Sequence, residues 1–344
     1  MAEALPAGRR FDADAAAFLP VRALRAVLSH RDPEQALGIG AAWGRRVAML
    51  GGAATDLSRI NLGVAFPEQT NEWRERVLSD AYASLGRGVA ELALLQGPHR
   101  ARLLEGVTLE GEAHLTAAES ASPTGGALIV SGHFGTWDLY AAAFAARGHA
   151  LTVVHRGFAN RRLTDMMTTV RAQGGGDLEE LRMGPRAAAG LLSALRRGRK
   201  CILLLDQNAR VDEGVFVPFF SRLACTRSAP ALVAMRRHVP VLPAFGHRTG
   251  AGPGHSVRIG EPIAIDPGTG DPRDPVQIAA LRENVARMTA AIEQAIRRAP
   301  EHWLWSHRRW RTRPVEPAEE RVEVYPPRSG VLRTARHWLR DRLR

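Results

Sequence analysis

The spacing of apolar residues differs between two parts of this chain, one before residue 110 and the other after residue 127. In the first part, apolar residues recur every three or four positions. The pattern is most regular after Thr70, where one side carries Val77, Tyr82, Leu85, Val89 and Leu92. That spacing is typical of an amphipathic helix. We therefore expect residues 1 to about 110 to be helical.

After residue 127, short apolar runs alternate with longer helical patterns. The runs that predict strands are 127–130, 151–154, 201–205, 239–245 and a further one near 256–259. The patterns that predict helices are 137–147, 160–172, 185–197, 228–237 and 275–298. This alternation indicates an α/β fold, with a central, mostly parallel sheet flanked by helices. We expect three regions: a membrane-associated helical one (1–110), an α/β domain (111–314) and a basic tail (315–344).

A histidine and an aspartate follow the first predicted strand, in Ser131-Gly-His-Phe-Gly-Thr-Trp-Asp138. Side chains five positions apart on one helix point about 140° away from each other. Both reach one site only if His133 lies on the loop and Asp138 in the first helical turn. The carboxylate then holds one ring nitrogen and leaves the other free to accept a proton. The motif predicts a general base with its orienting acid; an ordinary hydrogen-bonded loop histidine is the alternative.

Polar residues also follow the next two predicted strands. Arg156 comes after the second strand, and Asp206 and Gln207 come after the third. In open α/β sheets, ligands bind at the carboxyl ends of the strands. We therefore expect these residues to share one edge with His133. Taken singly, a solvated arginine and a capping aspartate are the simpler interpretations.

Two later stretches concentrate aromatic residues. Val215–Phe220 carries Phe216, Phe219 and Phe220 beside a proline. It predicts either an apolar groove for a long chain or an edge strand packed on the core. Pro300–Pro314 interleaves tryptophan, histidine and arginine. Such a segment suits phosphate and membrane interfaces, and it also suits the stacking of nucleobases.

Composition narrows the partners and the chemistry. The 344-residue chain has a formal net charge of +12, and Lys200 is its only lysine. An excess of arginine favours an anionic partner such as nucleic acid, a membrane surface or an acidic carrier. Cys201 and Cys225 are not spaced as metal ligands, so we interpret them as core thiols. The sequence holds no Gly-x-Ser-x-Gly, His-Glu-x-x-His or Gly-Lys-Ser/Thr motif, and we expect no such hydrolase, metal or P-loop site.

Two segments are candidates for membrane contact. Ala36–Ala54 is apolar, but Arg45 and Arg46 interrupt it, so it is too short to span a bilayer. We interpret it as a helix near a membrane surface, with small residues at a packing face; a buried helix weakened by glycine fits equally well. The basic tail Val331–Arg344 predicts an amphipathic helix, and a solvated tail is the alternative.

Six blocks of the sequence, taken in order, resemble the lipid A late acyltransferases, which are the lauroyl and myristoyl transferases of the lysophospholipid acyltransferase superfamily. The blocks are Asn61–Pro67 (NLGVAFP), His133–Asp138 (HFGTWD), Val154–Arg156 (VHR), Asp206–Gln207, Val215–Phe220 (VFVPFF) and Pro300–Pro314. The match covers most of the chain. It departs from the family at Asp138, where many members carry glutamate, and in a weak N-terminal hydrophobic anchor. These departures bear on the acceptor rather than on acyl transfer.

The resemblance implies an O-acyltransferase. It would move a fatty acyl chain from an acyl-carrier-protein thioester to a hydroxyl of a membrane glycolipid, lipid A or a precursor, with no acyl-enzyme and no cofactor. His133 would be the general base, and Asp138 would orient it. The implied location is the cytoplasmic face of the bacterial inner membrane, in a peripheral or monotopic arrangement.

Substrate contacts are implied as well. Arg156 would bind a phosphate or the developing oxyanion, and Asp206 and Gln207 would position the acceptor. Three neighbours in the last block would meet headgroup phosphates, namely His307, Arg308 and Arg309.

Two other functions fit parts of the sequence. One is the same chemistry on another acceptor, such as a phosphatidylinositol mannoside or a lysophospholipid. The other is a non-catalytic protein that binds an anionic polymer or a membrane through its arginines. Nucleic-acid binding ranks well below both enzyme hypotheses, because the chain holds no base-reading motif.

Overall fold

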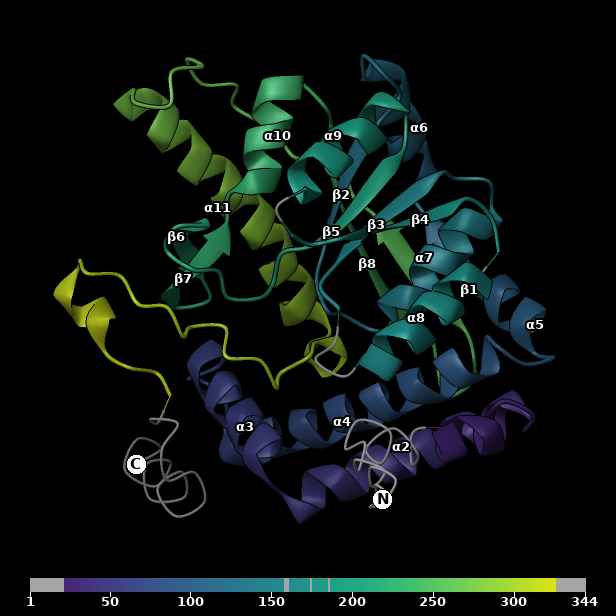
Figure 1. Cartoon of the computed structure of the whole chain (residues 1–344). Coiled ribbons are helices and arrows are strands. Elements are labelled where there is room, and N and C mark those ends of the chain that lie inside the picture. Colours follow the sequence, from purple (N-terminus) through teal and green to yellow (C-terminus); the bar gives the residue numbers. More distant parts are fainter. Residues whose placement is uncertain (1–21, 158–160, 174, 185, 326–344) are drawn as a thin grey trace, which may run out of the picture.

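The computed structural model describes residues 22–157, 161–173, 175–184 and 186–325. A seven-stranded sheet lies at its centre, in the order β1-β9-β8-β2-β5-β3-β4 (Figure 1). Its strands are β1 (Val107–Glu110), β2 (Ala127–Ser131), β3 (Leu151–His155), β4 (Leu178–Arg182), β5 (Lys200–Leu204), β8 (Val241–Arg248) and β9 (His255–Ile259). Neighbouring strands are parallel except β8 and β9. A separate antiparallel hairpin joins β6 (Gly214–Phe219) to β7 (Arg222–Arg227).

Helices cover both faces of the sheet because its central strands are apolar on both sides. Leu128 and Val130 of β2 point into one buried cluster, and Ala127 and Ile129 point into the other. The first cluster packs under α9 (Ala187–Arg196), α10 (Ala229–Arg237) and α11 (Pro275–Arg298). The second packs under α5 (Arg100–Glu105), α6 (Glu112–Ala121), α7 (Trp137–Ala146) and α8 (Arg161–Gln173). The expected α/β class is confirmed.

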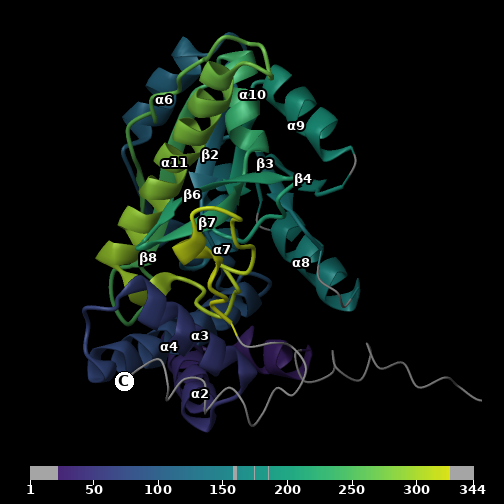
Figure 2. The same ribbon diagram turned by 90° about the vertical axis from the view of Figure 1, so that its left-hand side faces the viewer.

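A helical layer from the N-terminal part lies across one end of the sheet, as both ribbon views show (Figures 1 and 2). It consists of α2 (Pro33–Leu50), α3 (Ala53–Ala65) and α4 (Asn71–Leu94). Thr70 caps α4, because its hydroxyl oxygen accepts from the Trp73 amide at 3.2 Å. The expectation that one apolar side of this helix faces the core is only partly right. Leu85 and Val89 are exposed.

The five strands and five helices expected after residue 127 are present, with ends shifted by at most a few residues. The sequence patterns missed β1, β4 and β7, and β6 corresponds to the edge strand that was one of the two interpretations of Val215–Phe220. β1 lies inside the region expected to be helical, where it pairs with β9. No described helix is long and apolar enough to cross a membrane. The amphipathic helix expected at Val331–Arg344 lies outside the described residues.

Candidate active site

The polar residues expected at one edge of the sheet do lie together there. His133 follows β2, Asp206 follows β5 and Arg156 follows β3. β5 lies between the other two strands and pairs with both in parallel. Their carboxyl ends therefore meet at one edge, which α4 crosses.

The ring of His133 is held by Asp206. The imidazole Nδ1 lies 2.9 Å from Asp206 Oδ1, and the His133 backbone amide donates to Oδ2 at 2.9 Å. The indole N–H of Trp303 also donates to Oδ2, at 2.8 Å. Since a carboxylate can only accept, Nδ1 carries the proton and donates it to Asp206. Nε2 is then unprotonated and carries the lone pair that a general base requires.

Asp138 lies in the first turn of α7, as expected, but its side chain is not hydrogen-bonded to the ring of His133. Its carboxylate is buried and accepts from Arg171 Nε at 2.7 Å, and Arg171 also donates to Glu180 at 2.9 Å. The predicted hydrogen bond between Asp138 and the His133 ring is therefore wrong in this structure; Asp206 makes it instead. The strand order explains why Asp206 rather than Asp138 contacts the ring, because β5 lies directly beside β2 and Asp206 follows β5. Asp138 instead faces α8 and β4.

The charges around His133 favour a basic ring. Burial disfavours the imidazolium, but the charge and hydrogen bond of Asp206 outweigh it and raise the pKa of His133 above its ordinary value. Asp138 adds a weaker effect in the same direction. Burial alone would raise the pKa of Asp206, yet the charge of His133 and its ring and backbone hydrogen bonds hold that pKa well below the usual range. Asp206 is therefore ionised at neutral pH.

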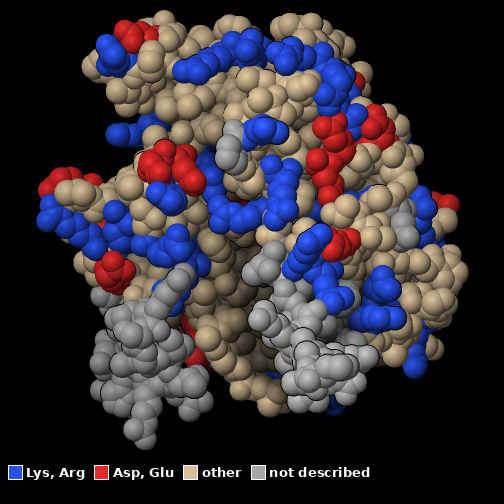
Figure 3. Space-filling view, viewed as in Figure 1, with Lys and Arg blue, Asp and Glu red and all other residues tan. Residues whose placement is uncertain are grey.

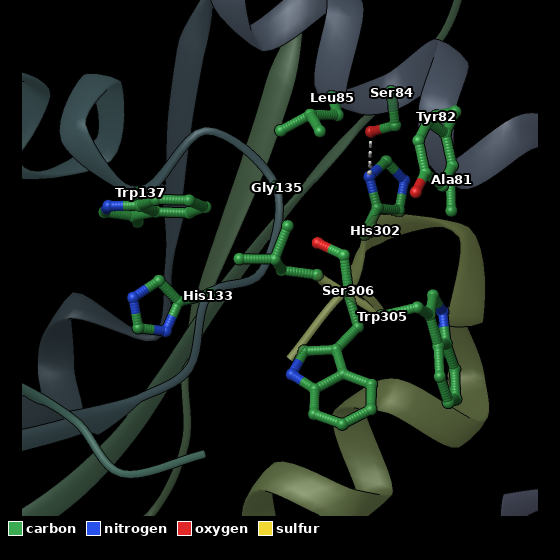
Figure 4. A pocket seen from close by; sticks show the side chains of 12 residues that line it. Ala81, Tyr82, Ser84, Leu85, His133, Gly135, Trp137, His302, Trp305 and Ser306 are labelled. Carbon is green, nitrogen blue, oxygen red and sulfur yellow. Dashed lines mark hydrogen bonds between the residues drawn. The ribbon is translucent and has the colours of Figure 1, made fainter. Parts of the chain in front are cut away.

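A pocket opens beside His133. One wall carries His133 and Trp137, whose rings meet edge to face at 4.9 Å. A second wall comes from α4 and includes Tyr82, Ser84 and Leu85, and the rest comes from residues 302–306 (Figure 4). The amide of Gln207 lies 3.3 Å from His133 Nε2. Because Nδ1 carries the ring proton, Nε2 accepts this contact from the Gln207 amide, while His133 itself lines the pocket.

The aromatic segment after α11 holds the loop that carries His133. Phe134 forms an antiparallel bridge with Trp303, and the amide of Gly135 donates to the His302 carbonyl at 2.8 Å. Gly135 has φ +60, and a Cβ there would collide with Tyr140 and with the Gly246 carbonyl. Only glycine fits that position without strain. The loop is therefore fixed from both sides.

The sequence is similar to one family of proteins along most of its length. Residues 17–312 match the family of bacterial lipid A biosynthesis acyltransferases. This chain belongs to that family. The lipid A biosynthesis palmitoleoyltransferase of Escherichia coli (strain K12) is 25% identical over 260 residues, or 75% of this chain and 79% of that protein. The lauroyltransferase of the same strain is 25% identical over 255 residues (74% and 78%), and the myristoyltransferase is 24% identical over 307 residues (86% and 86%).

The chain is accordingly an acyltransferase, and its last block contributes in a way that the sequence did not predict. Trp303, Trp305 and Trp310 are buried in the core, so these three rings cannot stack nucleobases, which was one interpretation of the segment 300–314. Asn61, the first residue of the NLGVAFP block, helps to hold this segment in the core. Its buried amide donates to the carbonyls of Trp305 and His307 at 2.6 Å each.

The three residues expected to meet headgroup phosphates differ in exposure. Arg309 is fully buried; its guanidinium donates to the Cys225 carbonyl at 2.9 Å and to Thr226. Burial lowers the pKa of Arg309 to about 10. Its structural role excludes headgroup contact in this arrangement. His307 accepts from the Asn208 amide at 3.0 Å, and burial lowers its pKa to about 4, so it is neutral at pH 7. Arg308 is half-buried over the ring of Tyr325.

The three phenylalanines of the expected acyl groove belong to the hairpin β6–β7 and its neighbours. Phe219 is fully buried between Trp303 and Trp310, with ring centroids 5.8 Å from each. Phe220 is buried as well, and Phe216 is half-buried. Phe219 and Phe220 therefore serve the core, as the alternative interpretation held, and none of the three lines the pocket beside His133.

Arg156 is exposed at the end of β3. A Cβ on its neighbour Gly157 would lie 3.1 Å from Arg182 Nη2, so the two arginine-bearing strand ends are adjacent. Arg182 and Arg186 are exposed as well. Figure 3 shows Lys and Arg side chains gathered across the middle of the face in view, beside a hollow in the surface. Arg156 and Arg182 place exposed positive charge at the carboxyl ends of β3 and β4.

A buried ionic network lies behind the loop that carries His133, and the sequence patterns did not predict it. Glu91 of α4 accepts from Arg248 and contacts His255 Nε2 at 2.7 Å. Thr136, three residues after His133, donates to the same carboxylate at 2.5 Å. Burial would raise the pKa of Glu91, but the charge of Arg248 outweighs it and lowers that pKa to about 2. One sign of this network in the sequence is Glu91, a carboxylate among the apolar residues near the end of α4.

Neither cysteine takes part in the site. Cys201 and Cys225 are buried free thiols, and burial raises the pKa of Cys201 to about 12. Among the described residues, no group of three histidine, cysteine or carboxylate side chains could hold a metal ion.

Proposed function

We propose that this enzyme transfers a fatty acyl chain from an acyl-carrier-protein thioester to a hydroxyl of lipid A or its precursor. Membership of the lipid A acyltransferase family supports the acceptor class. The observation that carries the chemistry is the His133–Asp206 pair beside an open pocket, with Nδ1 held at 2.9 Å and Nε2 unprotonated. No cysteine lines that pocket, and neither of its two serines is hydrogen-bonded to His133: Ser84 Oγ lies 3.3 Å from His302 Nδ1, and the ring of His133 contacts Asp206 and Gln207.

The reaction proceeds by direct attack. His133 Nε2 takes the proton from the acceptor hydroxyl, and the oxygen attacks the thioester carbonyl carbon. Asp206 keeps the ring in the right tautomer and stabilises the imidazolium that forms. The tetrahedral intermediate then collapses, the C–S bond breaks, and the imidazolium returns its proton to the carrier thiolate. The chemistry needs no cofactor, because the thioester is already activated and no electrons are exchanged.

Asp138 takes a different part in this proposal. Together with Arg171 and Glu180 it ties the first turn of α7 to α8 and β4. It thereby positions the loop that carries His133, while its charge weakly favours the imidazolium. We assign it a positioning role and give the catalytic carboxylate to Asp206.

The substrates are proposed to bind along the basic face. Arg156, with Arg182 beside it, is placed to bind a phosphate of the acceptor. The exposed arginines of this face (Figure 3) suit an acidic carrier protein as donor. Arg308 is retained as a headgroup contact; Arg309 is not. The reaction would take place at the cytoplasmic face of the bacterial inner membrane, with the enzyme bound peripherally or monotopically.

The test is an acyl-transfer assay with purified protein, laurate-loaded acyl carrier protein and acceptors in detergent micelles. The acceptors are a lipid A precursor, a phosphatidylinositol mannoside and a lysophospholipid, and His133→Ala is the control. We expect transfer to the lipid A precursor that is lost in the control. Transfer to another acceptor alone would replace the lipid A assignment. Transfer that persists in His133→Ala, or its absence with every acceptor, would refute the proposed mechanism.

A further inference from the structure

Two helices of the N-terminal layer touch backbone to backbone. A Cβ at Gly40 of α2 would overlap the Gly86 carbonyl of α4, and one at Gly44 would overlap the Tyr82 carbonyl. Small residues at such a contact let helices approach closely. The order of the contacts, Gly40 with Gly86 and Gly44 with Tyr82, shows that the two helices run antiparallel. The glycine face of α2 is therefore buried against α4 and does not contact another molecule.

An exposed apolar face lies alongside this contact. On α2 it consists of residues spaced as one helical stripe, and on α4 of two residues one turn apart. The members and their exposed fractions are Ile39 (40%), Trp43 (59%), Val47 (37%) and Leu50 (81%) on α2, and Leu85 (43%) and Val89 (43%) on α4. We call this set the α2/α4 apolar face.

Both stripes point to the same side of the helix pair. Trp43 immediately precedes the contact residue Gly44, and Leu85 immediately precedes Gly86. In two antiparallel helices, residues that are the same number of positions before a contact residue point to the same side of the helix pair. Arg45 lies on the opposite flank, where it pairs with Asp80. The six apolar residues therefore form one surface rather than two.

The chemistry of this surface fits a lipid headgroup region better than it fits water. Soluble monomers seldom expose contiguous apolar patches of this kind without a partner. Trp43 has the amphipathic ring that favours membrane interfaces. Arg46 is exposed and lies one helical turn from both Trp43 and Leu50, and no acidic residue occurs between Ala36 and Ala54, so the charge beside the face suits anionic headgroups.

The face continues into the catalytic pocket. Leu85 belongs to the α2/α4 apolar face and also lines the pocket that holds His133 (Figure 4). Leu85 therefore links the face to the path that a lipid would take through the pocket toward His133. We propose that the α2/α4 apolar face docks the enzyme on an anionic bilayer, so that the pocket opens at the docked side. The path toward His133 rests on the function proposed above; docking itself does not.

The test is flotation of the purified full-length protein with phosphatidylcholine vesicles, with and without phosphatidylglycerol. Ile39→Glu is the main variant. Ile278→Glu is its matched control, because Ile278 is an isoleucine of similar exposure (46%) on α11, away from this face. Leu50→Glu is a second variant at the end of α2, where so exposed a side chain carries little packing. Circular dichroism checks that all three variants are folded.

We expect the vesicle-bound fraction to fall about tenfold in Ile39→Glu and in Leu50→Glu, the effect of removing one buried aliphatic side chain. Ile278→Glu should bind like the parent, and the parent should bind better when phosphatidylglycerol is present. Equal binding of all proteins, or an equal loss in Ile278→Glu, would overturn the proposal. So would a parent dimer that Ile39→Glu dissociates without loss of vesicle binding, because a second copy would then cover the face.

The two proposals fail in different ways. If the acyl-transfer chemistry is wrong, the parent shows no transfer in detergent micelles, whatever its binding to vesicles. If the docking face is wrong, the parent transfers acyl chains and floats, and Ile39→Glu does both equally well. We expect Ile39→Glu to keep parental turnover in micelles and to lose it on vesicles.

Discussion

Asp206 and Asp138 are both buried carboxylates near one edge of the sheet, and each is held by a single cationic or titratable partner. Asp206 accepts from His133, whose other nitrogen faces a pocket. Asp138 accepts from Arg171, which is itself buried and shared with Glu180. The difference lies in what the partner can still do. A histidine between a carboxylate and an open pocket can exchange a proton, whereas an arginine between two carboxylates stays charged and holds structure together.

The largest effect should come from Asp206→Asn. An asparagine amide can donate to Nδ1 and so stabilise the tautomer that carries its proton on Nε2, which cannot act as a base. We expect kcat to fall by about 10²–10⁴-fold with little change in stability. Steady-state acyl transfer and urea unfolding of the same preparations measure the two quantities. Near-parental kcat would remove Asp206 from the mechanism.

Asp138→Asn should show the opposite profile. Neutralising one member of a buried ion pair leaves Arg171 with Glu180 alone, and we expect a loss of about 3 kcal/mol in the free energy of unfolding. Turnover at a temperature where the variant is folded should fall less than tenfold, since His133 keeps Asp206. If Asp138→Asn instead matched Asp206→Asn in kcat while keeping full stability, Asp138 would be the carboxylate that serves the base.

The pH dependence sharpens the same comparison. His133 must be neutral to accept a proton, and Asp206 raises the pKa of His133. Activity of the parent should therefore rise with pH through a midpoint above the ordinary histidine value of about 6.5. In Asp206→Asn only burial and the weaker charge of Asp138 remain, so the midpoint of the residual activity should move to lower pH. The kcat profiles of both proteins test this; a midpoint that stays in place would mean that another group titrates.

Local patterns in the sequence were enough to find the sheet and its edge. The runs before His133, Arg156 and Asp206 are short, apolar and separated by helical patterns, and each became a strand with its polar residue at the carboxyl end. The partner of His133 could not be found in this way. It depends on β5 pairing with β2, with Ser131 opposite Leu204, and residues 73 positions apart carry no local trace of that pairing.

Burial was the other quantity that the sequence did not supply. Arg309 resembles a surface cation, yet backbone carbonyls and a hydroxyl around it satisfy the guanidinium inside the core. Leu85 and Val89 resemble core residues of an amphipathic helix, yet the glycine contact between α2 and α4 turns them outward. In each case side chains from distant segments decide the outcome.

Gln207 should give the smallest effect, and it separates positioning from proton transfer within the site. Its amide lies 3.3 Å from His133 Nε2, where an acceptor hydroxyl must arrive. If Gln207 guides that hydroxyl, Gln207→Ala removes one hydrogen bond worth about 1 kcal/mol and raises the KM for the acceptor about fivefold. The kcat and its pH midpoint should hardly change, because Asp206 still sets the tautomer and charge of the ring. Initial rates at varied acceptor concentration measure this. A large fall in kcat with an unchanged KM would instead mean that Gln207 stabilises the transition state, as Asp206 does, and does not only position the acceptor.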